Sequence, residues 1–389
     1  MLAAWATSSP AAEPVASVRR VYDGTLTPDE AVATFRHIDR LFPSRIIHHG
    51  PRVMPLPPAA HRLSGPLPFE SRGKRWDLYD YLAVNRVAGL LVLKQGHIAL
   101  ELYQYGNGPE TRWMSMSIAK SITSTLMGAA IADGHIGSLD DGVAKYIPQL
   151  RGSAYDGVSL RELLTMSSGV QWNETYTDPS SDRRRLLEIQ IEQKPGAALE
   201  LMRRLPRAAP PGSVSHYNTG ETLVAGEVVH QAVGRSLSQY LEERIWRPFG
   251  MEADATWWLV SPDGIEMAGS GFSATLRDYG RFGLFVLGGG RIGERQVLPA
   301  GWVEEAGARQ HLADGKPVDY GYFWWPAIAT PSTPDPEGAF LGEGIFGQFL
   351  YINRREDVVA VVWSARSKPE GMDIIDDLDF FGAVVRALR

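Results

Sequence analysis

Two segments far apart in the chain place apolar or alternating stretches on either side of a turn, in the way typical of β-hairpins. Residues 87–105 hold an apolar run, a Gln95-Gly96 turn and an alternating stretch. Residues 348–352 and 358–363 flank a polar turn near the end of the chain and predict a second hairpin. Strands from both ends of the chain therefore flank a central portion in which helical spacing is favoured.

Helical spacing is clearest in the segment that follows the first hairpin. Residues 117–133 have no proline, no glycine before Gly128 and apolar side chains on most faces, and Gly134 closes them, so they predict a buried central helix. Residues 150–249 repeat apolar positions at helical intervals, and residues 374–388 predict a closing helix. Residues 12–72 are broken by prolines and keep one helical patch at 28–42.

Together these patterns predict an α+β fold, in which an α/β sandwich with an antiparallel sheet flanked by helices carries an inserted all-helical domain. We expect residues 1–75 to form an arm on the body, and residues 76–150 and 260–389 to form the α/β domain. Residues 151–259 are expected to form the mostly helical domain. An active site is predicted between the two domains.

Composition narrows the range of partners. The chain has 389 residues, 44% of them hydrophobic and 22% charged, which is globular composition. The net charge of -6 leaves no basic excess to neutralise a phosphate backbone, so we expect a small-molecule substrate and no nucleic acid. The absence of cysteine excludes disulfides, thiolate metal sites and cysteine nucleophiles.

The first seven residues lack the basic region and the long apolar run of an intact signal peptide. No uncharged apolar stretch approaches the roughly 18 residues that suggest a membrane-spanning helix. We therefore expect no membrane span and a cytoplasmic location, or a periplasmic or secreted one if a leader has been removed. A homodimer is left open.

The candidate chemistry lies at the start of the predicted central helix, in Ser117-Ile118-Ala119-Lys120. A lysine three residues after a serine lies one helical turn away on the same face, where it can take the hydroxyl proton. To act as that base, Lys120 needs a pKa roughly 3 units below its usual value of about 10.4, which burial can supply. The Ser117 N–H at the helix start is suited to hold an oxyanion.

A motif this short also occurs by chance. A second copy, Ser71-Arg72-Gly73-Lys74, is predicted to lie in a polar loop, so placement on a buried helix favours Ser117. The chain has no Gly-x-Ser-x-Gly elbow, no His-Glu-x-x-His zinc site and no phosphate-binding Gly-x-x-x-x-Gly-Lys loop. No metal and no cofactor are expected.

The segment 117–120 resembles the active-site helix of the penicillin-recognising serine hydrolases, which include class C β-lactamases, D,D-peptidases and related esterases and amidases. Residues 160–169, and residues 269–275 with Asp278 and Arg281, are similar to further segments of that family. Residues 172–179 are similar to a loop of 6-aminohexanoate-dimer hydrolases, which cleave a linear amide. The resemblance implies a β-lactamase/transpeptidase-like fold.

The resemblance also implies roles for further residues. Tyr217 matches the tyrosine that relays the proton between nucleophile and leaving group, although Thr219 stands where the family has asparagine. The Ile345 N–H would be the second oxyanion donor beside Ser117. Two aromatic residues would shape the substrate pocket or would equally be core anchors of their loop, namely Trp172 and Tyr176.

The family's third motif places a lysine or histidine on the strand that lines the site, yet residues 341–348 contain no Lys, Arg or His. Glu343 and Gly344 are the substrate-binding candidates there, and Glu343 would repel an anion. Gly342 and Gly344 are equally explained by a bend at a strand edge. The missing cation argues against β-lactams and peptidoglycan termini as preferred substrates.

The sequence therefore predicts a serine hydrolase that cleaves a carboxylic ester or a linear amide through an acyl-enzyme. Two alternatives stay open: a β-lactamase or D,D-peptidase with the same chemistry, and a catalytically silent ligand-binding or sensor domain.

Overall fold

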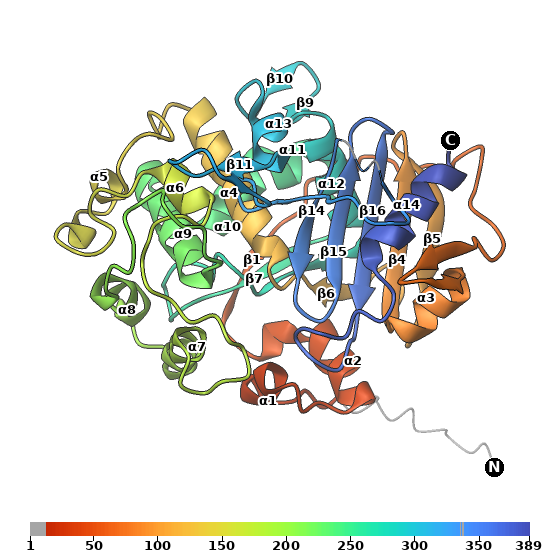
Figure 1. The fold of residues 1–389 in the computed structure, drawn as a ribbon, viewed down its shortest axis with the longest axis horizontal. Coiled ribbons are helices and arrows are strands. Elements are labelled where there is room, and N and C mark those ends of the chain that lie inside the picture. Colours follow the sequence, from red (N-terminus) through yellow and green to blue (C-terminus); the bar gives the residue numbers. More distant parts are fainter. Residues whose placement is uncertain (1–12, 335, 337) are drawn as a thin grey trace, which may run out of the picture.

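A six-stranded antiparallel sheet forms one half of the molecule, and the computed structural model describes residues 13–334, 336 and 338–389 (Figure 1). The strand order is β13-β14-β15-β16-β4-β5. Both predicted hairpins are present, and β16 pairs with β4, so that Val361 lies opposite Leu91. The strands are β4 (Val87–Lys94), β5 (His97–Tyr103), β13 (Trp325–Pro326), β14 (Ala339–Gly344), β15 (Gln348–Asn353) and β16 (Val358–Ser364).

Helices cover both faces of this sheet, because alternate residues of its buried strands point to opposite sides. Helix α14 (Asp377–Ala387) and α3 (Leu78–Val84) pack on one face. Helix α12 (Leu276–Leu287) packs on the other, where a Cβ at Gly283 would lie 2.6 Å from Val359 Cγ1. The predicted closing helix begins at Asp377, three residues later than expected, because Asp376 caps it by accepting from Leu378 N at 2.9 Å.

The other half of the molecule is mainly helical, and α4 (Ile118–Ala132) lies between it and the sheet (Figure 1). Helix α4 is the predicted central helix, and Gly134 follows it in a left-handed conformation with φ 76°. Its main partner in the helical half is α9 (Thr219–Val233). The remaining elements of this half are α5 (Val143–Tyr146), α6 (Leu160–Leu164), α7 (Asp182–Glu192), α8 (Ala197–Arg204), α10 (Leu237–Leu241), the π-helical turn η3 (Glu242–Trp246) and α11 (Arg247–Phe249).

The N-terminal segment is built into the body at two places. Its β1 (Ser44–Ile47) pairs with β7 (Ala255–Trp258) in a second sheet of order β1-β7-β8-β6, so strand structure starts before residue 260. The helical patch predicted at 28–42 is α2 (Pro28–Arg36) followed by the 3-10 turn η1 (Ile38–Arg40). The other elements here are α1 (Val18–Asp23), β6 (Arg112–Met114) and β8 (Phe272–Thr275).

The second Ser-x-x-Lys copy does not lie in a polar loop. Ser71 ends β2 (Phe69–Ser71) and Lys74 begins β3 (Lys74–Trp76), so the motif spans a hairpin turn. Ser71 is fully buried and its Oγ accepts from Asp376 N at 2.9 Å. The expectation of a loop was wrong because residues 69–71 and 74–76 pair as strands. The residue that hydrogen-bonds Ser71, Asp376, lies 305 residues away in sequence, so its contribution is not visible locally.

No helix in the described part of the chain is both long and apolar enough to cross a membrane. The first seven residues, on which the expectation about a signal peptide rests, lie outside the described residues.

Candidate active site

Ser117 and Lys120 lie together at the start of α4. Ser117 is the N-cap residue of this helix, and its side chain makes no capping hydrogen bond, which leaves the hydroxyl available. Lys120 Nζ lies 2.8 Å from Ser117 Oγ and donates to Gly269 O at 3.0 Å. One turn of helix therefore brings amine and hydroxyl into hydrogen-bond contact, as the spacing predicted.

The environment of Lys120 suits a base. Its side chain is 1% exposed, and desolvation lowers its pKa from 10.5 to about 7. The negative charge of Glu174 opposes this shift, and the positive charge of Arg183 adds to it. Near neutral pH about half of the Lys120 side chains are thus uncharged and able to accept a proton.

Tyr217 completes the group from the helical half, just before the N-cap of α9. Lys120 Nζ lies 5.0 Å from the centre of its ring, and Tyr217 and Ser117 line the same cleft. Burial and the charge of Glu174 raise the pKa of Tyr217, while the contact with Ser117 lowers it. The phenol is therefore protonated and can pass a proton between Ser117 and a neighbouring atom.

The β14 backbone approaches the start of α4 closely, which explains one of the two glycines in this strand. A Cβ at Gly344 would lie 2.5 Å from Ser115 O and 3.0 Å from Ser117 N. Neither the Ser117 N–H nor the Ile345 N–H donates to a backbone carbonyl among the residues that the structure describes. Two free N–H groups at this junction are what an oxyanion hole requires.

Glu174 is the site residue that the sequence reasoning missed. Its carboxylate accepts from Trp172 Nε1 and from the backbone N–H of Thr219 at 2.9 Å, and it also bonds the Thr219 hydroxyl. Thr219 is the residue that departs from the family pattern. Glu174 hydrogen-bonds Thr219, and its negative charge also acts on the pKa of Lys120. The acidic residue between two candidate aromatic residues was the available signal.

The two predicted pocket aromatics have different positions. Tyr176 is 6% exposed and lines the cleft, and burial raises the pKa of its hydroxyl well above the usual value. Trp172 lies behind the wall, where its indole holds Glu174 and its carbonyl accepts from His216 Nε2 at 2.8 Å. Tyr176 therefore meets the cleft directly, whereas Trp172 supports it.

A cleft of about 650 Å³ opens above Ser117 between the helical half and the edge of the sheet. Lys120 lies beneath its wall, and Asp278 and Arg281 form a buried ion pair at 2.9 Å elsewhere in the core. No group of three or more His, Asp or Glu that could hold a metal is found among the described residues. The predicted site residues on the cleft wall are Ser117, Tyr176, Tyr217, Glu343, Gly344 and Ile345.

The fold places a candidate nucleophile at the start of a buried helix, beside the edge of a sheet. Comparison with known protein families identifies the class of protein to which such a chain belongs. Residues 83–381 match the family model described as Beta-lactamase, and the chain belongs to the beta-lactamase family. It is a hydrolase of that family, an esterase or amidase.

The 6-aminohexanoate-dimer hydrolase of Paenarthrobacter ureafaciens is 30% identical over 308 residues, which cover 76% of this chain and 76% of that protein. A Bacillus anthracis structure provisionally assigned as a 6-aminohexanoate-dimer hydrolase has a TM-score of 0.79 at 24% identity, covering 92% of this chain and 94% of the other. A family VIII carboxylesterase has a TM-score of 0.57 at 16% identity, covering 78% and 92%. The predicted fold is confirmed by these likenesses.

Proposed function

We propose that this protein cleaves a carboxylic ester or a linear amide through an acyl-enzyme on Ser117. The observation that carries the proposal is the 2.8 Å contact between Ser117 Oγ and the amine of Lys120, whose burial lowers its pKa to about 7. A serine hydroxyl becomes a strong nucleophile only when an adjacent base takes its proton, and an uncharged lysine is such a base.

The proposed reaction has two halves. Uncharged Lys120, with Tyr217, takes the proton from Ser117 Oγ while the oxygen attacks the carbonyl carbon. The negative charge then moves to the carbonyl oxygen, where the N–H groups of Ser117 and Ile345 hold it. As the tetrahedral intermediate collapses, Tyr217 protonates the departing alcohol or amine and takes a proton back from Lys120, which is again an uncharged base. Water repeats the attack on the acyl-enzyme and frees the acid and the serine.

The substrate class follows from the strand beside the nucleophile. A β-lactam presents a carboxylate, which a lysine or histidine would bind, whereas the residues here are Gly342 and Glu343. A carboxylate close to Glu343 would be repelled whenever both groups are charged. The names of the relatives, a 6-aminohexanoate-dimer hydrolase and a carboxylesterase, support a linear amide or an ester instead.

The test compares kcat/KM for a short-chain aryl ester, a linear ω-amino-acid amide and a chromogenic cephalosporin, using wild type and Ser117→Ala. We expect the ester or the amide to be hydrolysed faster than the cephalosporin, and all turnover to be lost in the variant. Faster turnover of the cephalosporin would favour a β-lactamase. Binding of ester and amide without release of alcohol or amine would favour a sensor domain.

A further inference from the structure

The cleft that opens on Ser117 is strongly acidic. Seven carboxylates line it, together with the cationic side chains of Arg366 and Lys368, and three of the carboxylates are paired with arginines: Asp319 with Arg309, Asp373 with Arg72 and Asp377 with Arg366. The carboxylates are Glu174, Asp319, Glu343, Glu370, Asp373, Asp376 and Asp377. Because a cleft with low-dielectric walls focuses the field of such charges, it selects ligands by charge.

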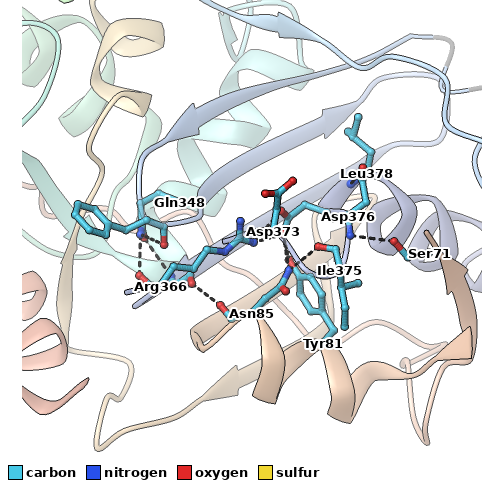
Figure 2. Close-up of polar contacts among 12 residues, drawn as sticks. Ser71, Tyr81, Asn85, Gln348, Arg366, Asp373, Ile375, Asp376 and Leu378 are labelled. Atoms are coloured by element: carbon cyan, nitrogen blue, oxygen red, sulfur yellow. Dashed lines mark hydrogen bonds and ion pairs between the residues drawn. The ribbon is translucent and has the colours of Figure 1, made fainter. Parts of the chain in front are cut away.

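The two cationic side chains on the wall differ, because Arg366 is buried and paired with a carboxylate, whereas Lys368 is exposed and hydrogen-bonds a neutral backbone carbonyl. Arg366 is 7% exposed and its guanidinium donates to both carboxylate oxygens of Asp377, at 2.7 and 2.8 Å. Figure 2 shows Arg366 reaching toward Tyr81 and Asn85, which also donate to Asp377, at 2.7 and 3.3 Å. Lys368 Nζ donates to Gly24 O at 2.7 Å. The network thus pairs Arg366 with Asp377 and fixes the guanidinium in place.

The carboxylate of Glu343 is free by contrast. It makes no hydrogen bond and no ion pair with any residue that the structure describes, although it is exposed to the cleft. It extends from β14 into the cleft whose wall it shares with Ser117 and Tyr217, and its negative charge raises the pKa of Tyr217. Apolar side chains surround it on the same wall, because Phe349 is its cross-strand partner and Leu341 precedes it on β14.

We propose that Glu343 is a specificity-determining residue that selects substrates carrying a positively charged ammonium group close to the scissile ester or amide. This inference rests on the proposed function, because Ser117 marks the cleft as the site of reaction. The carboxylate would receive the ammonium group, and the apolar wall would contact the alkyl carbons that join it to the carbonyl.

The preference should depend on pH. Desolvation, followed by the charge of Asp377, raises the pKa of Glu343 to about 7, while Arg366 lowers it. Glu343 is therefore ionised to a greater extent at pH 8 than at pH 6. The charged or titratable groups that face it from the neighbouring segments are Asp373, Glu370, Arg366, Asp377, Tyr217 and Tyr320.

The experiment uses two pairs of esters that match in shape and differ in charge. A choline ester is compared with its 3,3-dimethylbutyl analogue, and a 4-(trimethylammonio)butanoate aryl ester with its 5,5-dimethylhexanoate analogue. The first pair places the cation on the alcohol and the second on the acyl group. The measured quantity is the ratio of kcat/KM for the cationic ester to that for the neutral one, in which the ionisation of Lys120 cancels.

In wild type we expect a ratio of roughly two to five in at least one pair at pH 8, falling toward one at pH 6. Glu343→Gln, which keeps the size of the side chain, should reduce that ratio to about one, and Glu343→Lys should reverse it. The control is Asp319→Asn, an acidic residue of the same cleft that pairs with Arg309, and it should keep the wild-type ratio.

A ratio near one in both pairs for wild type, or a high ratio that survives in Glu343→Gln, would overturn the inference. Hydrolysis of the neutral esters that persists in Ser117→Ala would instead refute the proposed function. The two failures are therefore distinguishable in one set of assays.

Discussion

Replacing Lys120 with methionine should abolish hydrolysis and change how the stability of the protein depends on pH. The fold holds the Lys120 amine away from water and lowers its pKa from 10.5 to about 7. Between about pH 7 and pH 10.5, the unfolded chain therefore binds more protons at Lys120 than the folded protein does. The free energy of unfolding of wild type therefore rises with pH in that window, relative to a variant without the amine.

The magnitude follows from the two pKa values. The lowered pKa of Lys120 reduces the free energy of unfolding of wild type by about 4 kcal/mol at pH 7.5 and by about 1.5 kcal/mol at pH 9.5. The reduction is smaller at the higher pH because fewer unfolded chains are protonated at this lysine. The advantage of Lys120→Met over wild type should thus shrink by about 2.5 kcal/mol between these pH values. Lys120→Met also loses the hydrogen bonds to Ser117 Oγ and Gly269 O. This loss changes the free energy of unfolding equally at pH 7.5 and pH 9.5, so it does not affect the change between the two pH values.

The assay is urea denaturation of wild type and Lys120→Met at both pH values, with the free energy of unfolding taken from the midpoint and the slope. The control is Lys74→Met, since Lys74 is an exposed lysine in the other Ser-x-x-Lys copy. Its difference from wild type should not vary with pH. A pH-independent difference for Lys120→Met would mean that the folded lysine keeps its ordinary pKa, and the base role would then fail.

Further predictions concern the groups around this pair. Glu174→Gln removes a charge that raises the pKa of Lys120, so the acid limb of the kcat/KM profile should move to lower pH, and a shift to higher pH would contradict the electrostatics. Tyr217→Phe should lower kcat by roughly 10²- to 10⁴-fold with unchanged circular dichroism, and near-normal activity would exclude the proton relay. Gly344→Ala places a methyl group 3.0 Å from Ser117 N and should reduce kcat more than it raises KM, as measured by steady-state kinetics.

The parts of the fold that could be predicted from sequence are those with a local pattern. Both hairpins of the main sheet alternate or form apolar runs, and the helix at Ile118–Ala132 is apolar on most faces, so each is visible in a short window. The pairing of β1 with β7 is not visible in a short window, because the partners Ile46 and Thr256 lie 210 residues apart and β1 has only four residues. The burial of Ser71 depends likewise on Asp376.

The candidate site divides in the same way. The Ser117–Lys120 contact is a one-turn spacing that the sequence contains, and Tyr217 came from the resemblance to the family. Glu174 was missed because its partner Thr219 is 45 residues away, and only the fold brings the carboxylate to that N–H. The need for glycine at Gly344 was left open, because a close approach between a strand and a helix has no signature in one segment.

The central claim is that Ser117 Oγ forms the acyl-enzyme. Intact-protein mass spectrometry after treatment with a fluorophosphonate or an activated ester tests this claim most directly, with peptide mapping to locate the adduct. We predict one adduct per chain, located on the peptide that contains Ser117, and none in Ser117→Ala, while Ser71→Ala labels as wild type does. An adduct that forms undiminished in Ser117→Ala would contradict the account.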